Sequence, residues 1–259
     1  MSTGVIGAML PMDKILVGVR SGASALSPDV DAGHAAARAI MTTDTRPKEV
    51  AVGARTADGE YVVAGMVKGS GMIHPNMATM LSVIATNAAI TAELADRALR
   101  QAVDVSFHCM TVDGDTSTND TVLLLANGAA ALPKIDDSGS AAFGAFRQAL
   151  IAVATGLTQA VARDGEGATH FIEITVKGGR TAREARTVAK SVAGSLLFKT
   201  AIYGQDANWG RIVCAAGYSG VEIDPDQVSV WLGDLELFRK GAPYDVDEER
   251  ASEILNHVD

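Results

Sequence analysis

The amino-acid sequence of 259 residues predicts an α+β fold. Segments with helical spacing of apolar residues alternate with strand-like segments along the whole chain. The strand-like segments come in adjacent pairs, and no regular strand–helix–strand series appears. The pattern therefore favours paired strands covered by helices over a doubly wound parallel sheet.

The first elements are a helix and a hairpin. Asp29–Met41 has apolar and small residues at helical spacing, and Ser27-Pro28 is typical of a helix start. Val50–Ala54 and Tyr61–Val67 are two expected strands. The dipeptide Asp58-Gly59 between them is a hairpin signal, so we expect the strands to pair.

The middle of the chain continues with a strand, a helix, a strand and a long helix. Ser82–Thr86 and Val122–Ala126 are short apolar runs typical of buried strands. Thr91 is the expected N-cap of a helix that runs to about Phe107. Ala141–Ala162 predicts a long helix rich in small residues.

The last third predicts one more strand, a capped helix and a second hairpin. Phe171–Lys177 alternates between polar and apolar residues, which predicts a strand. Thr181 and Glu184 have the spacing of a capping box at a helix start. Val228–Leu232 and Leu235–Phe238 are expected to pair around Gly233-Asp234.

Composition excludes several functional classes. Hydrophobic residues make up 47% and charged residues 20%, which is ordinary for a globular protein and excludes disorder as the main state. Asp and Glu number 31 against 22 Lys and Arg, so the net charge is −9. Nucleic-acid binding requires a basic surface for phosphates, and we expect none. An anionic substrate would need a local Lys or Arg.

The sequence also bears on the cellular compartment. Cys109 and Cys214 lie far apart without metal-ligand spacing, which argues against a disulfide scaffold and a zinc module and fits a reducing compartment. Met1–Gly7 lacks the pattern of a secretory signal. No uninterrupted apolar run reaches the roughly 18–20 residues of a membrane span. We therefore expect a cytoplasmic protein without membrane contact or a metal site.

One segment, Lys68–Leu81, contains a candidate nucleophile. It turns through Gly69, Gly71 and a proline and re-enters an apolar strand at Thr79. The Thr79 hydroxyl could attack the preceding carbonyl, cut the chain between Ala78 and Thr79, and expose a new α-amine. Such an amine has a pKa of about 7.7–8.0, so it can take the hydroxyl proton as a general base. By spacing alone, a glycine-rich turn followed by a strand residue is the more common structure.

Three other segments combine polar residues with glycine. Met110–Thr121 contains three aspartates, but its spacing is not that of a calcium loop, and local turns are the favoured role. Lys199–Arg211 has the composition of a functional site, although Trp209 could equally start a helix. Asp164–Thr169 fits either a ligand loop or a helix C-cap followed by a turn. No serine-hydrolase elbow, Walker motif or dinucleotide fingerprint is found.

An ordered set of motifs resembles the glutamate N-acetyltransferase / ornithine acetyltransferase family of arginine biosynthesis. The motifs extend over almost the whole chain. The segments that carry the likeness are, in order, Thr3–Gly7, Ile40–Asp44, Lys68–Met72, Met77–Leu81, Asp113–Asp120, Asp164–Thr169 and Asn208–Arg211.

This resemblance implies a layered α–β–β–α sandwich over residues 1–259. It also implies self-cleavage into an α chain, residues 1–78, and a β chain, residues 79–259, which stay together and associate further, as a heterotetramer. The activity it implies is transfer of an acetyl group from N-acetylornithine to glutamate through an acetylated Thr79. Acetyl-CoA is a further donor in some members, and no cofactor is required.

The resemblance also assigns site residues. The oxyanion-hole pair falls on Thr3 and Gly4, and the substrate contacts fall on Thr42, Lys68, Thr79 and Glu166. A hydroxyl and a backbone N–H aimed at a developing oxyanion lower the barrier of acyl transfer, each typically by about 2.7–4 kcal/mol. Lys68 would supply the local positive charge that a carboxylate needs in an acidic protein. Glu166 could receive a substrate ammonium group.

The sequence departs from the family pattern at its ends. It begins at the oxyanion-hole motif and ends where relatives continue into a last strand and a tail, so we expect N- and C-terminal parts of the family to be missing. Ala207 and His170 replace a proline and a lysine that are common there. Two alternative functions stay open: an N-terminal-nucleophile aminopeptidase or amidase, and a truncated non-catalytic fragment.

Overall fold

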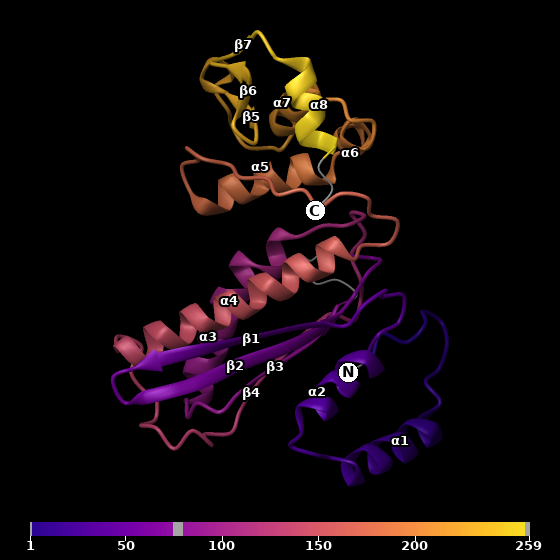
Figure 1. Cartoon of the computed structure of the whole chain (residues 1–259), viewed down its shortest axis with the longest axis vertical. Coiled ribbons are helices and arrows are strands. Elements are labelled where there is room, and N and C mark those ends of the chain that lie inside the picture. Colours follow the sequence, from indigo (N-terminus) through magenta and orange to yellow (C-terminus); the bar gives the residue numbers. More distant parts are fainter. Residues whose placement is uncertain (1, 75–79, 257–259) are drawn as a thin grey trace. The chain divides into compact units, whose positions relative to one another are not determined.

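The computed structural model describes residues 2–74 and 80–256. The chain divides into two compact units, Met1–Glu166 and Gly167–Asp259 (Figure 1). Each unit has a hydrophobic core of its own. Both units mix helices and strands, which confirms the α+β class.

The first unit is built on a four-stranded sheet of order β1-β2-β3-β4. The strands are β1 (Lys48–Thr56), β2 (Gly59–Lys68), β3 (Leu81–Thr86) and β4 (Thr121–Ala126). β1, β2 and β3 pair antiparallel in sequence order, and β4 runs parallel to β3. The expected hairpin and the two short apolar strands are therefore confirmed.

Helices α3 (Ala92–Val105) and α4 (Ala141–Arg163) pack against one another, and α4 also contacts β1 and β2 (Figure 1). Close approach of helix and sheet depends on two glycines. A Cβ at Gly65 would lie 2.9 Å from a Leu157 methyl group, and one at Gly156 would lie 3.0 Å from a Val50 methyl group. These helix and sheet layers are the first half of the α–β–β–α order that the resemblance implies.

Both long helices have the expected start. Thr91 accepts a hydrogen bond from the Leu94 N–H, and Ser140 accepts one from the Phe143 N–H. By length and composition alone, α4 could cross a membrane. Its packing accounts for that composition, since nine of its side chains are buried.

Two further helices and one 3₁₀ turn complete the first unit. They are α1 (Met12–Ser24), α2 (Val30–Ala39) and η1 (Phe107–Cys109). α2 confirms the helix expected over Asp29–Met41, whereas the sequence pattern did not predict α1. No side chain of α1 is buried, and only Ala37 of α2 is.

The second unit contains short elements. Its three-stranded antiparallel sheet has the order β5 (Val230–Leu232), β6 (Leu235–Arg239) and β7 (Ala242–Pro243). Trp209 stacks on Phe238 with ring centroids 4.7 Å apart. The expected hairpin around Gly233-Asp234 and the Thr181 N-cap are confirmed. The helices of this unit are α5 (Ala182–Gly194), α6 (Leu196–Tyr203), α7 (Trp209–Gly217), η2 (Pro225–Gln227) and α8 (Glu248–Asn256).

The strand expected at Phe171–Lys177 is wrong. These residues form no regular secondary structure. An alternating pattern specifies two faces, but a strand also needs a neighbouring backbone to pair with. In the part of the chain that the structure describes, no strand pairs with this segment.

Candidate active site

The candidate site lies at one end of the four-stranded sheet. Lys48 and Lys68 stand at the start of β1 and the end of β2, and Lys48 pairs with Val67 across the ladder. Lys68 pairs with Leu81, the first residue of β3, which in turn pairs with Thr121, the first residue of β4. The register therefore brings four strand ends, far apart in the sequence, to one edge.

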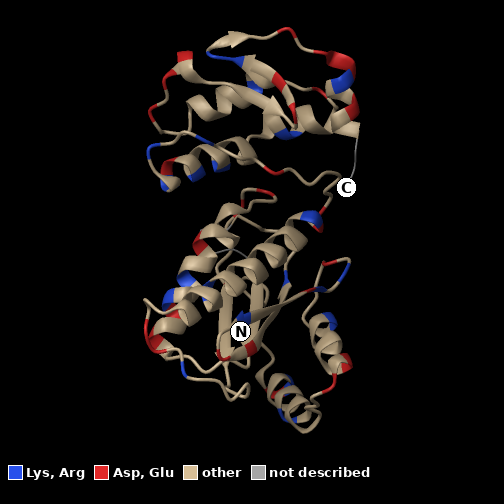
Figure 2. Ribbon diagram, turned by 60° about the vertical axis from the view of Figure 1, so that its left-hand side comes forward, with Lys and Arg blue, Asp and Glu red and all other residues tan. Residues whose placement is uncertain are grey.

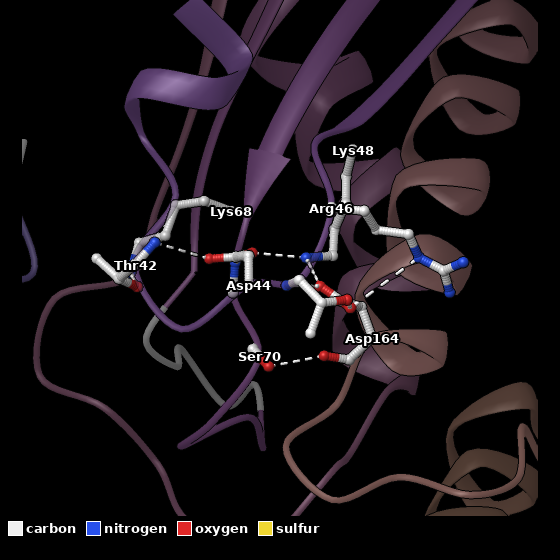
Figure 3. A network of polar contacts seen from close by, with 9 residues as sticks. Thr42, Asp44, Arg46, Lys48, Lys68, Ser70 and Asp164 are labelled. Atoms are coloured by element: carbon white, nitrogen blue, oxygen red, sulfur yellow. Dashed lines mark hydrogen bonds and ion pairs between the residues drawn. The ribbon is translucent and has the colours of Figure 1, made fainter.

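Lys68 lies at the centre of this edge. Only 2% of the residue is exposed. Its Nζ atom donates to the hydroxyl groups of Thr42, at 3.3 Å, and Thr3, at 3.5 Å. Figure 3 shows Lys68 beside Thr42. Burial lowers the pKa of Lys68, while Asp44 and Asp120 act in the opposite direction. Three residues that the sequence analysis assigned to the site are thus brought together.

Beside Lys68 lies a buried network of three charges, Asp44, Lys48 and Asp164 (Figure 3). The Lys48 Nζ atom is 2.5 Å from an oxygen of each carboxylate. All three side chains are at most 3% exposed. Burial alone would raise the pKa of Asp44 and of Asp164, but the hydrogen bond from Lys48 and further N–H or hydroxyl donors lower both pKa values.

Asp44 connects the network to the Lys68 region. Its carboxylate accepts hydrogen bonds from the backbone N–H groups of Thr42, at 3.0 Å, and Gly69, at 2.8 Å. The first N–H belongs to Thr42 itself, and the second belongs to the residue that follows Lys68 in the chain. Asp44 therefore positions the Thr42 hydroxyl and the Lys68 ammonium relative to one another.

Asp164 connects the network to the end of α4. It is the C-cap residue of that helix, which is one of the two roles that the sequence left open for Asp164–Thr169. Its carboxylate accepts hydrogen bonds from the backbone N–H and the hydroxyl of Thr45, and its carbonyl accepts one from the Ser70 hydroxyl at 2.7 Å. The Glu166 N–H donates to the Ser70 carbonyl at 2.9 Å. The loop after α4 is thereby tied to the backbone that follows Lys68.

Glu166 approaches the site at Gly71. A Cβ added at Gly71 would lie 2.6 Å from the Glu166 carboxyl carbon. A glycine is therefore required for this close approach. The Glu166 residue is exposed, so its carboxylate stays accessible to a ligand.

Thr3 contacts Lys68 through its hydroxyl, and Gly4 is the next residue in the chain. Gly4 has φ +55°, a left-handed conformation that glycine adopts without steric cost. Its N–H donates to the Ser2 hydroxyl at 3.2 Å. A ligand oxyanion bound at Gly4 would replace that hydroxyl as the acceptor.

The expected cleavage site, Ala78–Thr79, lies outside the described residues. The residues on both sides of it are held by the Met110–Thr121 loop. Asp113 accepts hydrogen bonds from the N–H groups of Met72 and Ile73, at 2.6 and 2.9 Å. Asp120 accepts one from the Met80 N–H at 2.7 Å.

This loop therefore does more than form the local turns that the sequence analysis favoured. Among residues 2–74 and 80–256, no group of three or more His, Cys, Asp and Glu residues could hold a metal ion.

The Lys199–Arg211 segment lies in the second unit and has a structural role there. Arg211 donates to the Leu197 carbonyl at 2.8 Å and the Thr200 hydroxyl at 3.1 Å, which ties α7 to α6. Asn208 caps α7, whose first residue is Trp209.

The comparison with protein families decides the identity. The profile of the ArgJ family matches residues 1–259. The chain belongs to the ArgJ family. This confirms the resemblance to glutamate N-acetyltransferase / ornithine acetyltransferase.

Curated relatives and a solved structure agree with this assignment. The arginine biosynthesis bifunctional protein ArgJ of Symbiobacterium thermophilum is 53% identical over 98% of this chain and 62% of its own length. The mitochondrial protein of the same name from Yarrowia lipolytica is 48% identical over 100% of this chain and 61% of its own length. The crystal structure of the Bacillus halodurans protein is 41% identical, with a TM-score of 0.68 over 70% of this chain and 84% of that one.

The chain thus spans about 60% of the length of the curated ArgJ relatives it matches. The residues that sequence reasoning missed are Asp44, Lys48, Asn119 and Asp120. Asp44, Asn119 and Asp120 were inside motifs quoted for the family, but their partners lie at distant positions of the chain, and no spacing rule indicates them.

Proposed function

We propose that this ArgJ-family chain transfers an acetyl group from N-acetylornithine to glutamate through an acetyl ester on Thr79. The observation that carries the proposal is the buried Lys68 ammonium, which the Thr3 and Thr42 hydroxyls share at the end of the sheet. Met80, the residue after Thr79, is anchored at the start of the strand that pairs with Lys68.

Substrate binding uses the two charges of opposite sign at this edge. Lys68 binds the carboxylate of the N-acetyl amino acid, because an ammonium held away from water attracts an anion more strongly than a solvated one does. Thr42 donates a hydroxyl hydrogen bond to the same ligand. Glu166 is exposed beside Gly71 and receives the side-chain ammonium of ornithine.

Self-cleavage prepares the nucleophile. The Thr79 hydroxyl attacks the Ala78 carbonyl, the acyl group moves from nitrogen to oxygen, and water hydrolyses the ester. The products are residues 1–78 and 79–259, with a free α-amine at Thr79 that can act as a general base.

Acetyl transfer then proceeds in two halves. The Thr79 oxygen attacks the acetyl carbonyl and its proton passes to the α-amine. The C–N bond breaks, and ornithine leaves with that proton. The neutral amine of glutamate attacks the acetyl ester, the ester C–O bond breaks, and the proton that the attacking nitrogen loses passes through the α-amine to the leaving Thr79 oxygen. Thr3 and the Gly4 N–H stabilise the oxyanion in both halves.

We also propose that the two cleaved parts stay together and that pairs of them associate as a heterotetramer. The scheme requires no cofactor, and acetyl-CoA is a second donor to be tested. Relatives include mitochondrial and bacterial proteins, so the family is not confined to one compartment. The cytoplasmic location expected from the sequence stays a prediction.

Mass spectrometry tests the proposal directly. Intact-mass analysis of the purified chain should show two parts that meet between Ala78 and Thr79. Incubation with N-acetylornithine should add one acetyl group to the peptide that begins with Thr79, and glutamate should remove it. Thr79→Ala should abolish both cleavage and transfer.

Thr91→Ala is a matched control, because it removes a threonine hydroxyl from a helix cap and leaves the site intact. Two outcomes would contradict the proposal. Release of acetate without dependence on glutamate would indicate a hydrolase. An uncut chain without acetyl transfer would indicate the non-catalytic alternative.

A further inference from the structure

Asn119 and Asp120 are consecutive residues immediately before β4, and neither has a role in the reaction described above. Their side chains contact two separate parts of the candidate site. Asn119 contacts the backbone at Ser2 and Thr3, and Asp120 contacts the backbone at Met80.

Asn119 fixes the peptide that carries the expected oxyanion donor. Its Nδ2 group donates to the carbonyl oxygens of Ser2 and Thr3, each at 3.0 Å. Its Oδ1 atom accepts a hydrogen bond from the Thr118 hydroxyl at 2.8 Å, so both ends of the amide have partners.

The geometry of the peptide bond makes this contact directional. The Thr3 carbonyl and the Gly4 N–H belong to one planar trans peptide, in which they point in opposite directions. A hydrogen bond that holds the Thr3 oxygen on one side therefore directs the Gly4 N–H to the other side.

Asp120 fixes the start of β3. Its Oδ1 atom accepts the Met80 N–H at 2.7 Å, and the Thr121 N–H donates to the Met80 carbonyl at 3.0 Å. The Asp120 Oδ2 atom is buried and has no hydrogen-bond partner among the described residues. Burying a carboxylate is costly when one of its two oxygens has no partner. This cost indicates that the position of Asp120 serves more than local stability.

We propose that Asn119 and Asp120 are positioning residues, which hold the Thr3–Gly4 peptide at a fixed distance from the backbone that follows Thr79. This inference rests on the proposed acetyl transfer. One peptide bond joins the two residues, with Cα atoms about 3.8 Å apart, so the spacing between their contacts is short and stiff. Acyl transfer requires such a spacing, because the donor must lie near the place where the oxyanion forms.

The two residues act on the transition state more than on substrate binding, which uses Lys68, Thr42 and Glu166. Asn119→Ala should therefore lower kcat by about 10- to 100-fold with KM changed by less than about threefold. Asn119→Asp has the same shape but places a carboxylate against two carbonyl oxygens, so its loss should be at least as large. Asn127→Ala, at the other end of β4, removes an exposed asparagine whose side chain accepts the Ala129 N–H in a turn, and is the matched control.

Two variants of Asp120 separate the effect of its hydrogen bond on kcat from the effect of its charge. Asp120→Asn keeps an acceptor oxygen for the Met80 N–H and removes the charge, whereas Asp120→Ala removes both. A positioning role predicts that kcat is retained within about threefold in Asp120→Asn and falls at least tenfold in Asp120→Ala. Equal losses in both variants would overturn it. Asp137→Asn and Asp137→Ala, at an exposed turn, are the control pair.

Each kcat is expressed per cleaved chain, measured by intact mass, so that a defect in self-cleavage is separated from a defect in transfer. If the wild type is active and Asn119→Ala has the same kcat, the positioning role is overturned and the proposed function stays intact.

Amide hydrogen exchange provides a readout that does not require turnover. The Met80 amide should exchange slowly in the wild type and in Asp120→Asn, and at least tenfold faster in Asp120→Ala. If the wild type is inactive, the proposed function fails on its own. Rapid exchange at Met80 in the wild type would then overturn the positioning role. Slow exchange in the wild type and in Asp120→Asn, with fast exchange in Asp120→Ala, would support it.

Discussion

The two units of the chain differ in their charged side chains, because the first unit has a buried charge network in addition to exposed ion pairs such as Arg55–Glu60. In the first unit, Asp44, Lys48 and Asp164 are at most 3% exposed and form one connected network. In the second unit, the ion pairs of Arg180, Arg239 and Arg250 each include an arginine side chain that is at least 50% exposed. The side chains of Arg250 and Asp234 are 51% and 74% exposed, and their charged groups are 2.8 Å apart. Figure 2 shows that acidic and basic residues are interspersed along the ribbon of both units.

This difference separates charges that organise a site from charges that keep a surface hydrated. A buried ion recovers its lost hydration only through well-placed partners, so removing one partner leaves the others uncompensated. An exposed pair loses little, because water replaces the partner. The buried network adjoins Thr42 and Lys68, and the expected site residues of this chain are all in the first unit or at the undescribed cleavage site.

The largest effect is expected from breaking the buried network. Lys48→Met should lower the free energy of unfolding of the first unit by about 3–5 kcal/mol, because two carboxylates lose the ammonium they share. Urea unfolding followed by amide exchange in β1 and β2 measures this unit. Both tryptophans lie in the second unit, so their fluorescence reports on that unit separately.

Two controls sharpen this test. Lys134→Met removes an exposed lysine from the same unit and should change stability by no more than about 0.5 kcal/mol. The triple variant Asp44→Asn, Lys48→Met, Asp164→Asn removes every charge of the network and should recover part of the loss. If Lys48→Met and Lys134→Met were equally stable, the network would have no role in stability.

Lowering the pH should change the stability that Asp44 and Asp164 contribute in the opposite direction to the stability that Asp120 contributes. The pKa of Asp44 and of Asp164 is lowered, so the stability they contribute is present at neutral pH and is lost as the pH falls below about 4. Burial raises the pKa of Asp120 to about 6, partly opposed by the Met80 N–H and by Lys68. Its contribution is therefore present below pH 4 and is lost as the pH rises through about 6.

Asp120→Asn isolates the second effect. This variant should gain stability over the wild type at pH 7, and the difference should shrink between pH 6 and pH 4. Unfolding midpoints of both proteins at pH 4, 5, 6 and 7 provide the measurement. A constant difference over this range would show that Asp120 does not titrate there.

Turn and cap motifs between neighbouring residues predicted most elements of the fold. They could not predict contacts between residues far apart in the sequence. The Asp58-Gly59 hairpin and the Thr91 and Thr181 caps depend on neighbouring residues, so the sequence pattern was sufficient. Phe171–Lys177 has the alternation of a strand without a pairing neighbour among the described residues. α1 was not predicted, although it carries apolar residues such as Leu16 and Val19, and the structure leaves both of them exposed.

The candidate site shows the same limit. The motifs indicated Thr3, Thr42 and Lys68, and the structure brings these three together. The partnership of Lys48 with Asp164 joins residues 116 positions apart, and that of Asn119 with Thr3 joins residues equally distant. In the sequence, Lys48 directly follows Pro47 and has the appearance of a surface charge.

The smallest effect is expected at the surface of the second unit. Arg250→Ala breaks the contact between α8 and the β5–β6 turn and should cost about 0–1 kcal/mol, because both side chains keep their hydration. High salt should reduce this difference, since the screening length at about 1 M salt is about 3 Å, close to the 2.8 Å that separates the two charged groups. Arg250→Lys keeps the charge and is the control. Tryptophan fluorescence during urea unfolding, at low and high salt, measures the change. A loss as large as that of Lys48→Met would mean that exposure does not separate the two kinds of charge.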